Sequence, residues 1–402
     1  MTGFGLHAAP PAGQWINDPN GLAFVAGRYR LFVQHRADAP DFVVTGWGRF
    51  SSDDLMHWDW DGEVLPARDE GFAYSGSITT GADARLSAWH TRHRSDGDPR
   101  ERQYVADSHD GGLTWGALVG PFGPAGHNAR DPFVFDHGGV RFMLFVRPGD
   151  WADAAGVSRI ELASQDGRGD WSLGADIGLA IPAGLICEVP SLLRFGDRWA
   201  LLASLVDRSG GGTASWTGYW LGDFDGGCFT PDRPAPTRLD LGPDFYAAIA
   251  NLDVGWPIEL VLIGWASSWA TARQLAVAGG GSGGAISLPR AVEICGSVLD
   301  LTPIAAALPH ARTLSWSVAA TLTINSDEAD LVVEVSNGWL QARRSGEAGW
   351  EWTCDHRDER IAGDLLLFHD AGLVELFIGG IAMTVMLPGQ PMSTVWEPHN
   401  GG

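Results

Sequence analysis

The chain of 402 residues has few basic residues and no closely spaced cysteines. Its 27 Lys+Arg face 49 Asp+Glu, which gives a net charge of −22 at pH 7. That balance argues against nucleic acid or an anionic membrane as a partner, because both require basic patches. A neutral or cationic small molecule is easier to accommodate. The four cysteines are at least 41 residues apart, so we expect free buried thiols rather than zinc ribbons or redox pairs.

The sequence also lacks segments that direct a chain into or across a membrane. Residues 1–13 contain no basic start and no apolar run of signal-peptide length. No window reaches the roughly 18 consecutive apolar residues of a membrane helix. We therefore expect a cytoplasmic protein, with export left open if a leader has been removed.

Amphipathic helical patterns are nearly absent from the first 290 residues. Short runs rich in aromatic and β-branched residues occur instead, and Gly, Pro and Asp clusters separate them. Examples are RYRLFVQH (28–35), RFMLFVRP (141–148) and RWALLASLV (198–206). Such runs are typical of β-strands. With 45% hydrophobic and 19% charged residues, the composition is that of a globular protein, and the length suits two or three domains.

A motif of Ser-x-Asp followed by Trp recurs at a fixed interval. Its three acids, Asp54, Asp110 and Asp166, are spaced by 56 residues each time, within SSDDLMHW (51–58), SHDGGLTW (108–115) and SQDGRGDW (164–171). We interpret each copy as a hairpin turn in which Ser and Asp cap the backbone and Trp returns to the core. A period near 56 suits a four-stranded propeller blade, and five blades take about 285 residues. The sequence therefore predicts an all-β fold that contains a five-bladed β-propeller.

The same period connects three acidic residues outside these turns. Steps of 56 or 57 residues from Asp18 reach Ser75, Asp131, Glu188 and Phe245. In a propeller the innermost strand of each blade lines the central axis, so equivalent positions in successive blades converge. We therefore expect Asp18, Asp131 and Glu188 to meet in one site, although each acid alone would also suit a turn next to proline.

Three converging carboxylates suit glycoside hydrolysis. Mutual repulsion separates their pKa values, so that one carboxyl stays ionised while another is held protonated near neutral pH. A glycosidase needs such a pair, because one carboxylate acts at the anomeric carbon and one acid protonates the leaving oxygen. Calcium binding is the competing chemistry. We disfavour it because calcium loops usually concentrate their acids in one segment, and we expect no cofactor or metal.

The chain resembles glycoside hydrolase family 32, which contains invertases, levanases, inulinases and related fructosyltransferases. Three motifs in this order carry the resemblance: WINDPNG (15–21), RDP (130–132) and EVP (188–190). Further matches extend it over nearly the whole chain: YRLFVQ (29–34), SSDDLMHW (51–58), YSGS (74–77), DFYA (244–247) and LVELFIGG (373–380). The resemblance implies a five-bladed propeller followed by a β-sandwich, and retaining hydrolysis of terminal β-fructofuranosides.

The resemblance also implies roles for individual residues. Asp18 corresponds to the nucleophile, Glu188 to the general acid/base, and Asp131 to a residue that stabilises the transition state through fructosyl hydroxyls. Six further positions correspond to substrate-binding residues, with packing or turn capping as the alternative for each: Asn17, Gln34, Trp47, Ser75, Arg130 and Tyr246. Two departures alter the surroundings of the acids, since Val189 follows Glu188 where the family commonly has Cys, and Arg49 replaces a His.

The predicted domains are a catalytic propeller over 1–297, a connector over 298–311 and a small β-sandwich over 312–402. Alternating strand patterns from about residue 312 support the sandwich. We expect it to pack against the propeller, with stability or homodimerisation as the effect.

The leading hypothesis is a retaining exo-acting β-fructofuranosidase that acts on sucrose or short fructans. A fructosyltransferase shares the same acids, so the motifs leave it open. A non-catalytic sugar-binding propeller is the third alternative, against which the presence of all three acids argues. A propeller enzyme directed at arabinose or xylose is disfavoured by the WINDPNG motif.

Overall fold

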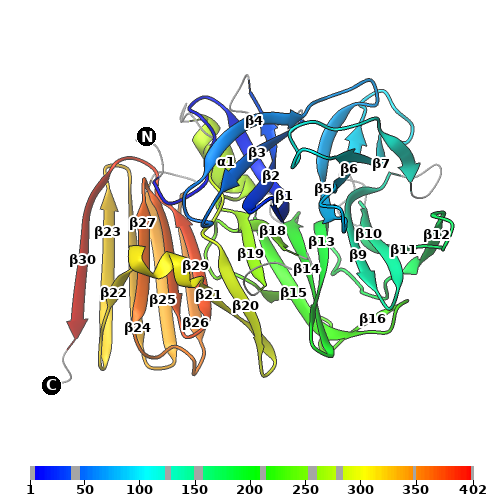
Figure 1. Cartoon of the computed structure of the whole chain (residues 1–402). Coiled ribbons are helices and arrows are strands. Elements are labelled where there is room, and N and C mark those ends of the chain that lie inside the picture. The colour runs from blue at the N-terminus through cyan, green and yellow to red at the C-terminus, as the bar shows by residue number, and fades with distance from the viewer. Residues whose placement is uncertain are drawn as a thin grey trace.

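The computed structural model describes residues 5–37, 46–122, 128–148, 157–208, 214–251, 260–277, 284–346 and 350–399. These residues form an almost entirely β structure of two bodies that lie side by side in Figure 1, a propeller up to β21 and a sandwich from β22 onward. The predicted five-bladed propeller followed by a β-sandwich is confirmed. The described helical elements are α1 (Trp269–Val277) and the short 3-10 helix η1 (Ala305–His310). Neither of these has the length and apolar character needed to cross a membrane.

Five antiparallel sheets follow one another along the chain, and each is one blade. The first contains β1 (Trp15–Val25), β2 (Arg28–Arg36), β3 (Gly46–Ser52) and β4 (Asp59–Leu65). The second contains β5 (Phe72–Thr80), β6 (Leu86–His93), β7 (Glu101–Ser108) and β8 (Val119–Phe122). The third contains β9 (Arg130–His137), β10 (Val140–Arg147), β11 (Arg159–Gln165) and β12 (Trp171–Asp176). The fourth contains β13 (Leu185–Phe195), β14 (Arg198–Asp207), β15 (Ser215–Phe224), β16 (Phe229–Pro231) and the added β17 (Thr237–Arg238). The fifth contains β18 (Tyr246–Ala250), β19 (Val261–Trp265), β20 (Arg290–Cys295) and β21 (Val298–Pro303).

The first strands of the blades form a closed ring. Each of β1, β5, β9 and β13 contacts the first strand of the next blade, and β18 contacts β1. Close approach of the backbones requires a small residue at one point of this ring. A Cβ at Gly21 of β1 would lie 2.4 Å from the Cγ1 atom of Ile78 in β5. The glycine of the WINDPNG motif therefore allows blades one and two to pack together.

The recurring Ser-x-Asp motif forms the turns between the third and fourth strands of the first three blades. The Oδ1 atoms of Asp54, Asp110 and Asp166 each accept hydrogen bonds at 2.8–3.0 Å from backbone N–H groups two to four residues further on. The tryptophans that end these motifs, Trp58, Trp115 and Trp171, pack against the hydrophobic core clusters. The interpretation of the repeat as a capped hairpin turn is confirmed.

The predicted connector over 298–311 begins too early. Its first six residues form β21, which pairs with β20 from Cys295 opposite Val298 to Arg290 opposite Pro303. Gly296, at φ 60°, and Ser297 make a two-residue hairpin between these strands. The connecting segment is therefore short and consists mainly of η1.

The sandwich has two antiparallel sheets with a separate hydrophobic core between them. The four-stranded sheet contains β22 (Arg312–Leu314), β27 (Leu365–Asp370), β28 (Leu373–Ile378) and β29 (Ile381–Met386). The five-stranded sheet contains β26 (Trp352–Arg357), β25 (Trp339–Gly346), β24 (Ala329–Ser336), β23 (Ala319–Ser326) and β30 (Pro391–His399). Inward positions alternate with outward ones along β23 and β24, as expected for a sandwich with one wet face.

Buried ion pairs join the sandwich to the propeller. Arg290 of β20 donates hydrogen bonds to Asp240 at 2.7 Å and to Glu375 of β28 at 2.9 Å, and all three side chains are almost completely buried. Arg344 of β25 donates to Asp244 at 2.7 Å. Asp240 and Asp244 belong to the segment that leads into β18. The sandwich therefore holds the start of the inner strand of the fifth blade.

Candidate active site

Each inner strand carries an irregularity close to its start. The register of β1 with β2 shifts at Pro19, that of β5 with β6 between Ala73 and Gly76, and that of β13 with β14 between Glu188 and Ser191. Comparable shifts occur in β9 and β18. A β-bulge re-aims the local side chains and leaves a residue unpaired. Proline has no N–H to lose at such a position, which explains why proline follows the acids so closely.

Three of these bulges hold a residue other than glycine in the left-handed region. Asp131, Val189 and Ala247 have φ values of 58°, 46° and 53°, at equivalent places in blades three, four and five. Such residues cost roughly 1–3 kcal/mol each unless the surroundings hold them. Hydrogen bonds hold them here, because the Asp131 N–H donates to Thr91 Oγ1 at 2.9 Å, the Val189 N–H to Asp131 Oδ2 at 3.0 Å and the Ala247 N–H to Ser204 Oγ at 2.8 Å.

The bulges place the three acids in one buried cluster, as the repeat period predicts. Asp18 comes from β1, Asp131 from β9 and Glu188 from β13. Asp18 and Asp131 are only 7% and 6% exposed. The three carboxyls are close enough for the charge of Glu188 to influence the pKa of both aspartates. Side chains that are far apart in the sequence therefore form a single site.

Arg130 and Tyr246 complete the cluster around Glu188. The Nη2 atom of Arg130 donates to Glu188 Oε1, and the Tyr246 hydroxyl donates to Glu188 Oε2 at 2.5 Å. The Nε atom of Arg130 also lies 3.8 Å from Asp131 Oδ2. Burial works against the charged guanidinium, but the surrounding carboxylates outweigh it and raise the pKa of Arg130 above its ordinary value. Both oxygens of Glu188 therefore accept a hydrogen bond.

A chain of side-chain hydrogen bonds orients Asp18. The Asn17 amide donates to Asp18 Oδ1 at 3.1 Å and to Gln34 Oε1 at 2.6 Å. Gln34 in turn donates to Ser75 Oγ at 2.8 Å, and the Ser75 hydroxyl donates to Asp18 Oδ2 at 2.7 Å. Three of the predicted substrate-binding residues thus contact the predicted nucleophile or each other. This closed set holds the carboxylate in one orientation.

Burial is the largest influence on the pKa values of the two aspartates. It raises the pKa of Asp18 from its ordinary value of 3.8 to about 6, and the negative charge of Glu188 adds to the rise. Burial also raises the pKa of Asp131 to about 7, where Arg130 opposes the rise and Glu188 adds to it. The surroundings therefore raise the pKa of both aspartates, and Asp18 loses its proton at a lower pH than Asp131 does.

Trp47 and Arg49 lie two residues apart on β3 but have different surroundings. Trp47 is completely buried, and its indole N–H donates to the Tyr74 carbonyl at 3.0 Å. Any contact of Trp47 with a sugar would therefore use the ring and not the N–H, and its role as a binding residue stays a prediction. Arg49 donates to Asp61 at 2.9 Å and to the Gly111 carbonyl at 2.6 Å. The replacement of the usual His by Arg49 therefore does not place a cation among the acids.

Two residues at the site have no signal in the sequence. Glu101, at the start of β7, lies 3.7 Å from Arg130 Nη1 and 3.5 Å from His93 Nδ1. Thr91 of β6 holds the backbone of Asp131 through its hydroxyl. Thr91 belongs to the second strand of blade two and Glu101 to the third. The spacing that relates the inner strands therefore does not reach them. Only the folded blade brings them to the cluster.

The position of Arg130 among the acids argues against the alternative of calcium binding. The Arg130 guanidinium contacts both Asp131 and Glu188, so a metal ion there would face a fixed positive charge. Across the ranges that the structure describes, no group of three or more His, Cys, Asp or Glu side chains is arranged to hold a metal ion.

Comparison with known proteins identifies the family. The model of the glycosyl hydrolases family 32 N-terminal domain matches residues 7–303. The extracellular exo-inulinase of Aspergillus niger is 28% identical over 314 residues, which cover 66% of this chain and 57% of that protein. The levanase of Bacillus subtilis is 29% identical over 308 residues, which cover 71% of this chain and 44% of that protein. The chain thus spans about half the length of the curated relatives it matches.

Solved structures agree on the fold. A mutant of the Bombyx mori family 32 β-fructofuranosidase in complex with sucrose superposes with a TM-score of 0.75 at 21% identity, covering 98% of this chain and 93% of that chain. A β-fructofuranosidase from Schwanniomyces occidentalis in complex with fructosyl-erythritol gives a TM-score of 0.78 at 19% identity, covering 98% and 94%. The family model covers all five blades and all three acids, so this chain belongs to glycosyl hydrolase family 32.

Proposed function

We propose that the protein is a retaining, exo-acting β-fructofuranosidase that releases terminal fructosyl units from sucrose or short fructans without a cofactor. The observation that carries this proposal is the convergence of Asp18, Asp131 and Glu188 around Arg130. Family membership supports a glycosidase, and the exo-inulinase and levanase among its relatives support fructose as the sugar. The acidity of the chain suits a neutral substrate.

In the first step, a carboxylate oxygen of Asp18 forms a bond to the fructosyl C2 atom while the bond from C2 to the leaving oxygen breaks. Glu188 transfers a proton to that leaving oxygen. Arg130 and Tyr246 each donate a hydrogen bond to Glu188 and so hold its carboxyl in place for this transfer. Asn17 and Ser75 keep Asp18 aligned for the attack, which lowers the entropic barrier.

In the second step, water attacks C2 and the bond to Asp18 breaks. Glu188 accepts the proton of that water and regains its starting form. Asp131, next to the reacting centre, accepts hydrogen bonds from fructosyl hydroxyls, and these bonds strengthen as positive charge develops on the ring. Gln34, Arg130 and Tyr246 complete the fructosyl pocket.

The direct test is fructose release from sucrose, raffinose, inulin and levan, with the anomeric form of the first product followed by NMR. We expect release from at least one substrate and initial appearance of the β-anomer. Dominance of oligosaccharides over free fructose at high sucrose would instead identify a fructosyltransferase. Absence of turnover with every fructoside would leave the sugar-binding propeller as the better explanation.

Replacing Glu188 by Gln separates the two proposed roles of the acids. We expect kcat/KM for sucrose to fall on the order of 10²–10⁴-fold, because a general acid is lost. An aryl β-fructofuranoside, whose leaving group needs little protonation, should lose much less. The wild-type acid limb near pH 6 reflects Asp18 and should move to lower pH in the variant, because the charge of Glu188 raises the pKa of Asp18.

The measurement is a pH profile of kcat/KM for both substrates. Gln34→Glu, which keeps Glu188 intact, is the control. It should keep the wild-type ratio of kcat/KM between sucrose and the aryl β-fructofuranoside. Equal losses for the two substrates, or an unmoved acid limb, would contradict the assignment of Glu188.

A homodimer through the sandwich and a cytoplasmic location stay predictions, and sedimentation of the purified protein tests the first.

A further inference from the structure

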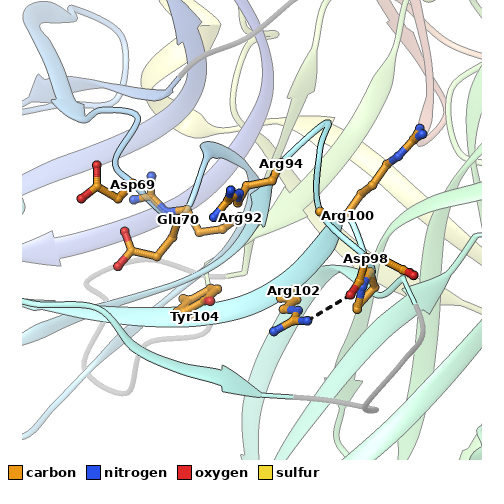
Figure 2. A pocket seen from close by; sticks show the side chains of 10 residues that line it. Asp69, Glu70, Arg92, Arg94, Asp98, Arg100, Arg102 and Tyr104 are labelled. Carbon is orange, nitrogen blue, oxygen red and sulfur yellow. Dashed lines mark hydrogen bonds between the residues drawn. The ribbon is translucent and has the colours of Figure 1, made fainter.

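A second cavity, of about 330 Å³, lies on blade two (Figure 2). Its lining includes four arginines from the end of β6, the loop after it and the start of β7: Arg92, Arg94, Arg100 and Arg102. Tyr104 and the acids Asp69, Glu70 and Asp98 also line it. This concentration is unusual in a chain of net charge −22 whose 27 basic residues are all arginine.

The strand register places Arg92 and Arg102 on the face of blade two opposite to Glu101. On the paired strands β6 and β7, His93 stands opposite Glu101 and Arg92 stands opposite Arg102. Glu101 contacts Arg130 of the catalytic cluster. Because successive side chains of a strand point to opposite faces, Arg92 and Arg102 point away from Glu101. The sheet of blade two therefore lies between these two arginines and the contact of Glu101 with Arg130.

Arg92 is a buried cation without a carboxylate partner. It is 1% exposed, and its Nη1 atom donates to the carbonyls of Pro66 at 2.9 Å and Gly71 at 3.0 Å. Its Nε atom donates to His90 Nε2 at 2.9 Å. Burial and the neighbouring arginine lower the pKa of His90 to about 3, so that this ring nitrogen can accept. Within the described ranges, Arg92 Nη2 has no hydrogen-bond partner.

The other guanidiniums of the cavity differ in how far they are engaged. Arg94 is held by Asp96, with both hydrogen bonds at 3.1 Å. Arg102 donates to the backbone carbonyl of Asp98 at 3.3 Å. Among the residues that the structure describes, neither Arg100 nor Arg102 forms an ion pair with a carboxylate. The guanidiniums of Arg92, Arg100 and Arg102 are thus available to an anion. Burial lowers the pKa of Arg92 to about 10, so this side chain is still charged at neutral pH.

We propose that this cavity binds a phosphate group, either as inorganic phosphate or as the phosphomonoester of a hexose. Guanidinium groups donate charge-assisted hydrogen bonds to phosphate oxygens, and Arg92 offers its Nη2 atom, a buried donor that has no hydrogen-bond partner among the described residues. The same lining suits the rest of a sugar phosphate, because Glu70 and Asp69 accept from hydroxyls and Tyr104 presents a ring. The volume lies within the range of small-molecule sites. The proposal does not depend on the reaction at Asp18.

Isothermal titration of the full chain in a phosphate-free buffer tests this. The ligands are inorganic phosphate, glucose 6-phosphate and glucose. We expect saturable binding of at least one phosphate ligand and none of glucose. Arg102→Met, at an exposed position, should weaken that binding about ten- to hundred-fold, the effect of losing one charge-assisted hydrogen bond. Arg343→Met, an exposed arginine of the sandwich, is the matched control and should leave it unchanged.

Two further titrations show where the ligand binds and which ligand the cavity prefers. Asp18→Asn should retain phosphate binding whether or not the protein hydrolyses fructosides, which separates this proposal from the catalytic one. Tighter binding of glucose 6-phosphate than of phosphate would assign a sugar phosphate, and equal affinities would assign phosphate alone. The proposal is overturned if neither phosphate ligand binds saturably up to about 10 mM, if Arg102→Met binds as the wild type does, or if fructose displaces the ligand.

Discussion

Replacing Asp18 by Asn abolishes turnover of β-fructosides and, at neutral pH, stabilises the folded protein. The loss of turnover follows from the proposed role, because an amide cannot form the covalent fructosyl intermediate. We expect a fall on the order of 10⁴-fold or more, the scale seen when a covalent nucleophile is removed. The side chain still fits, since the Asn17 amide can donate to the new carbonyl and the Ser75 hydroxyl can rotate to accept.

The gain in stability follows from the raised pKa of Asp18. The folded state holds this proton more tightly than the unfolded chain does, with a pKa of about 6 against 3.8. The associated stability is fully present below about pH 4 and is lost as the pH rises through about 6. A shift of about two units corresponds to an upper value of about 3 kcal/mol. A neutral amide avoids this loss, so we expect a gain of about 1–3 kcal/mol at pH 7 and little below pH 4.

Denaturant unfolding of both proteins as a function of pH measures this effect. Asp110→Asn is the control with the opposite sign. Burial raises the pKa of Asp110, but the hydrogen bonds from Thr114, Ser108 and Leu113 together outweigh it and hold the pKa below its ordinary value. The charge of Asp110 therefore stabilises the fold above about pH 4, and its removal lowers stability there. A less stable Asp18→Asn at pH 7, or an active one, would contradict the account of this site.

Replacing Arg290 by Met produces the largest expected loss of stability. The substitution leaves the buried Asp240 without its cation, and it leaves the buried Glu375 with His7, at 3.2 Å, as its remaining basic partner. Removal of one partner from a buried pair costs about 3–5 kcal/mol, because the remaining charge is uncompensated. Thr384 Oγ1 also loses the 2.6 Å hydrogen bond that it accepts from Arg290. The packing of the guanidinium over Phe245, at 4.2 Å, is lost as well.

The free energy of unfolding from denaturant titration measures this loss. Arg198→Met is the matched control, because Arg198 forms its ion pairs with Asp223 and Asp232 at an exposed site. Exposed pairs contribute about 0–1 kcal/mol, so this variant should unfold almost as the wild type does. Similar losses in the two variants would show that burial of the Arg290 network is not the source of its effect.

The acids of the site could be predicted because the blades repeat at a nearly constant spacing along the sequence. Asp18, Asp131 and Glu188 occupy equivalent bulges of inner strands, so a constant step along the chain locates them. Glu101 could not be found in this way, since it belongs to the third strand of blade two. The ion pair of Arg290 with Glu375 joins residues 85 apart in two different bodies, and no local pattern connects them.

The boundary of the propeller illustrates a different limit. The segment VLDLTP (298–303) is polar at alternate positions, and proline closes it, so it suits a connector as well as an edge strand. Its pairing with β20 depends on the two-residue turn at Gly296 and Ser297. The arginine-lined cavity of blade two could not be predicted either. Its residues lie close in the sequence, but only the alternation of β6 and β7 shows which of them share a face.

The buried ion pairs between the two bodies mean that the propeller is not an autonomous unit. The family model ends at residue 303, and a chain cut there would keep Asp240, Asp244 and Arg290 while losing Glu375 and Arg344. Asp244 lies two residues before Tyr246, whose hydroxyl holds Glu188. Such a fragment would present unpaired charges on a newly exposed face and would release the strand that positions Glu188 through Tyr246. The part of the chain that holds the cluster in place therefore extends beyond the residues that the family model matches.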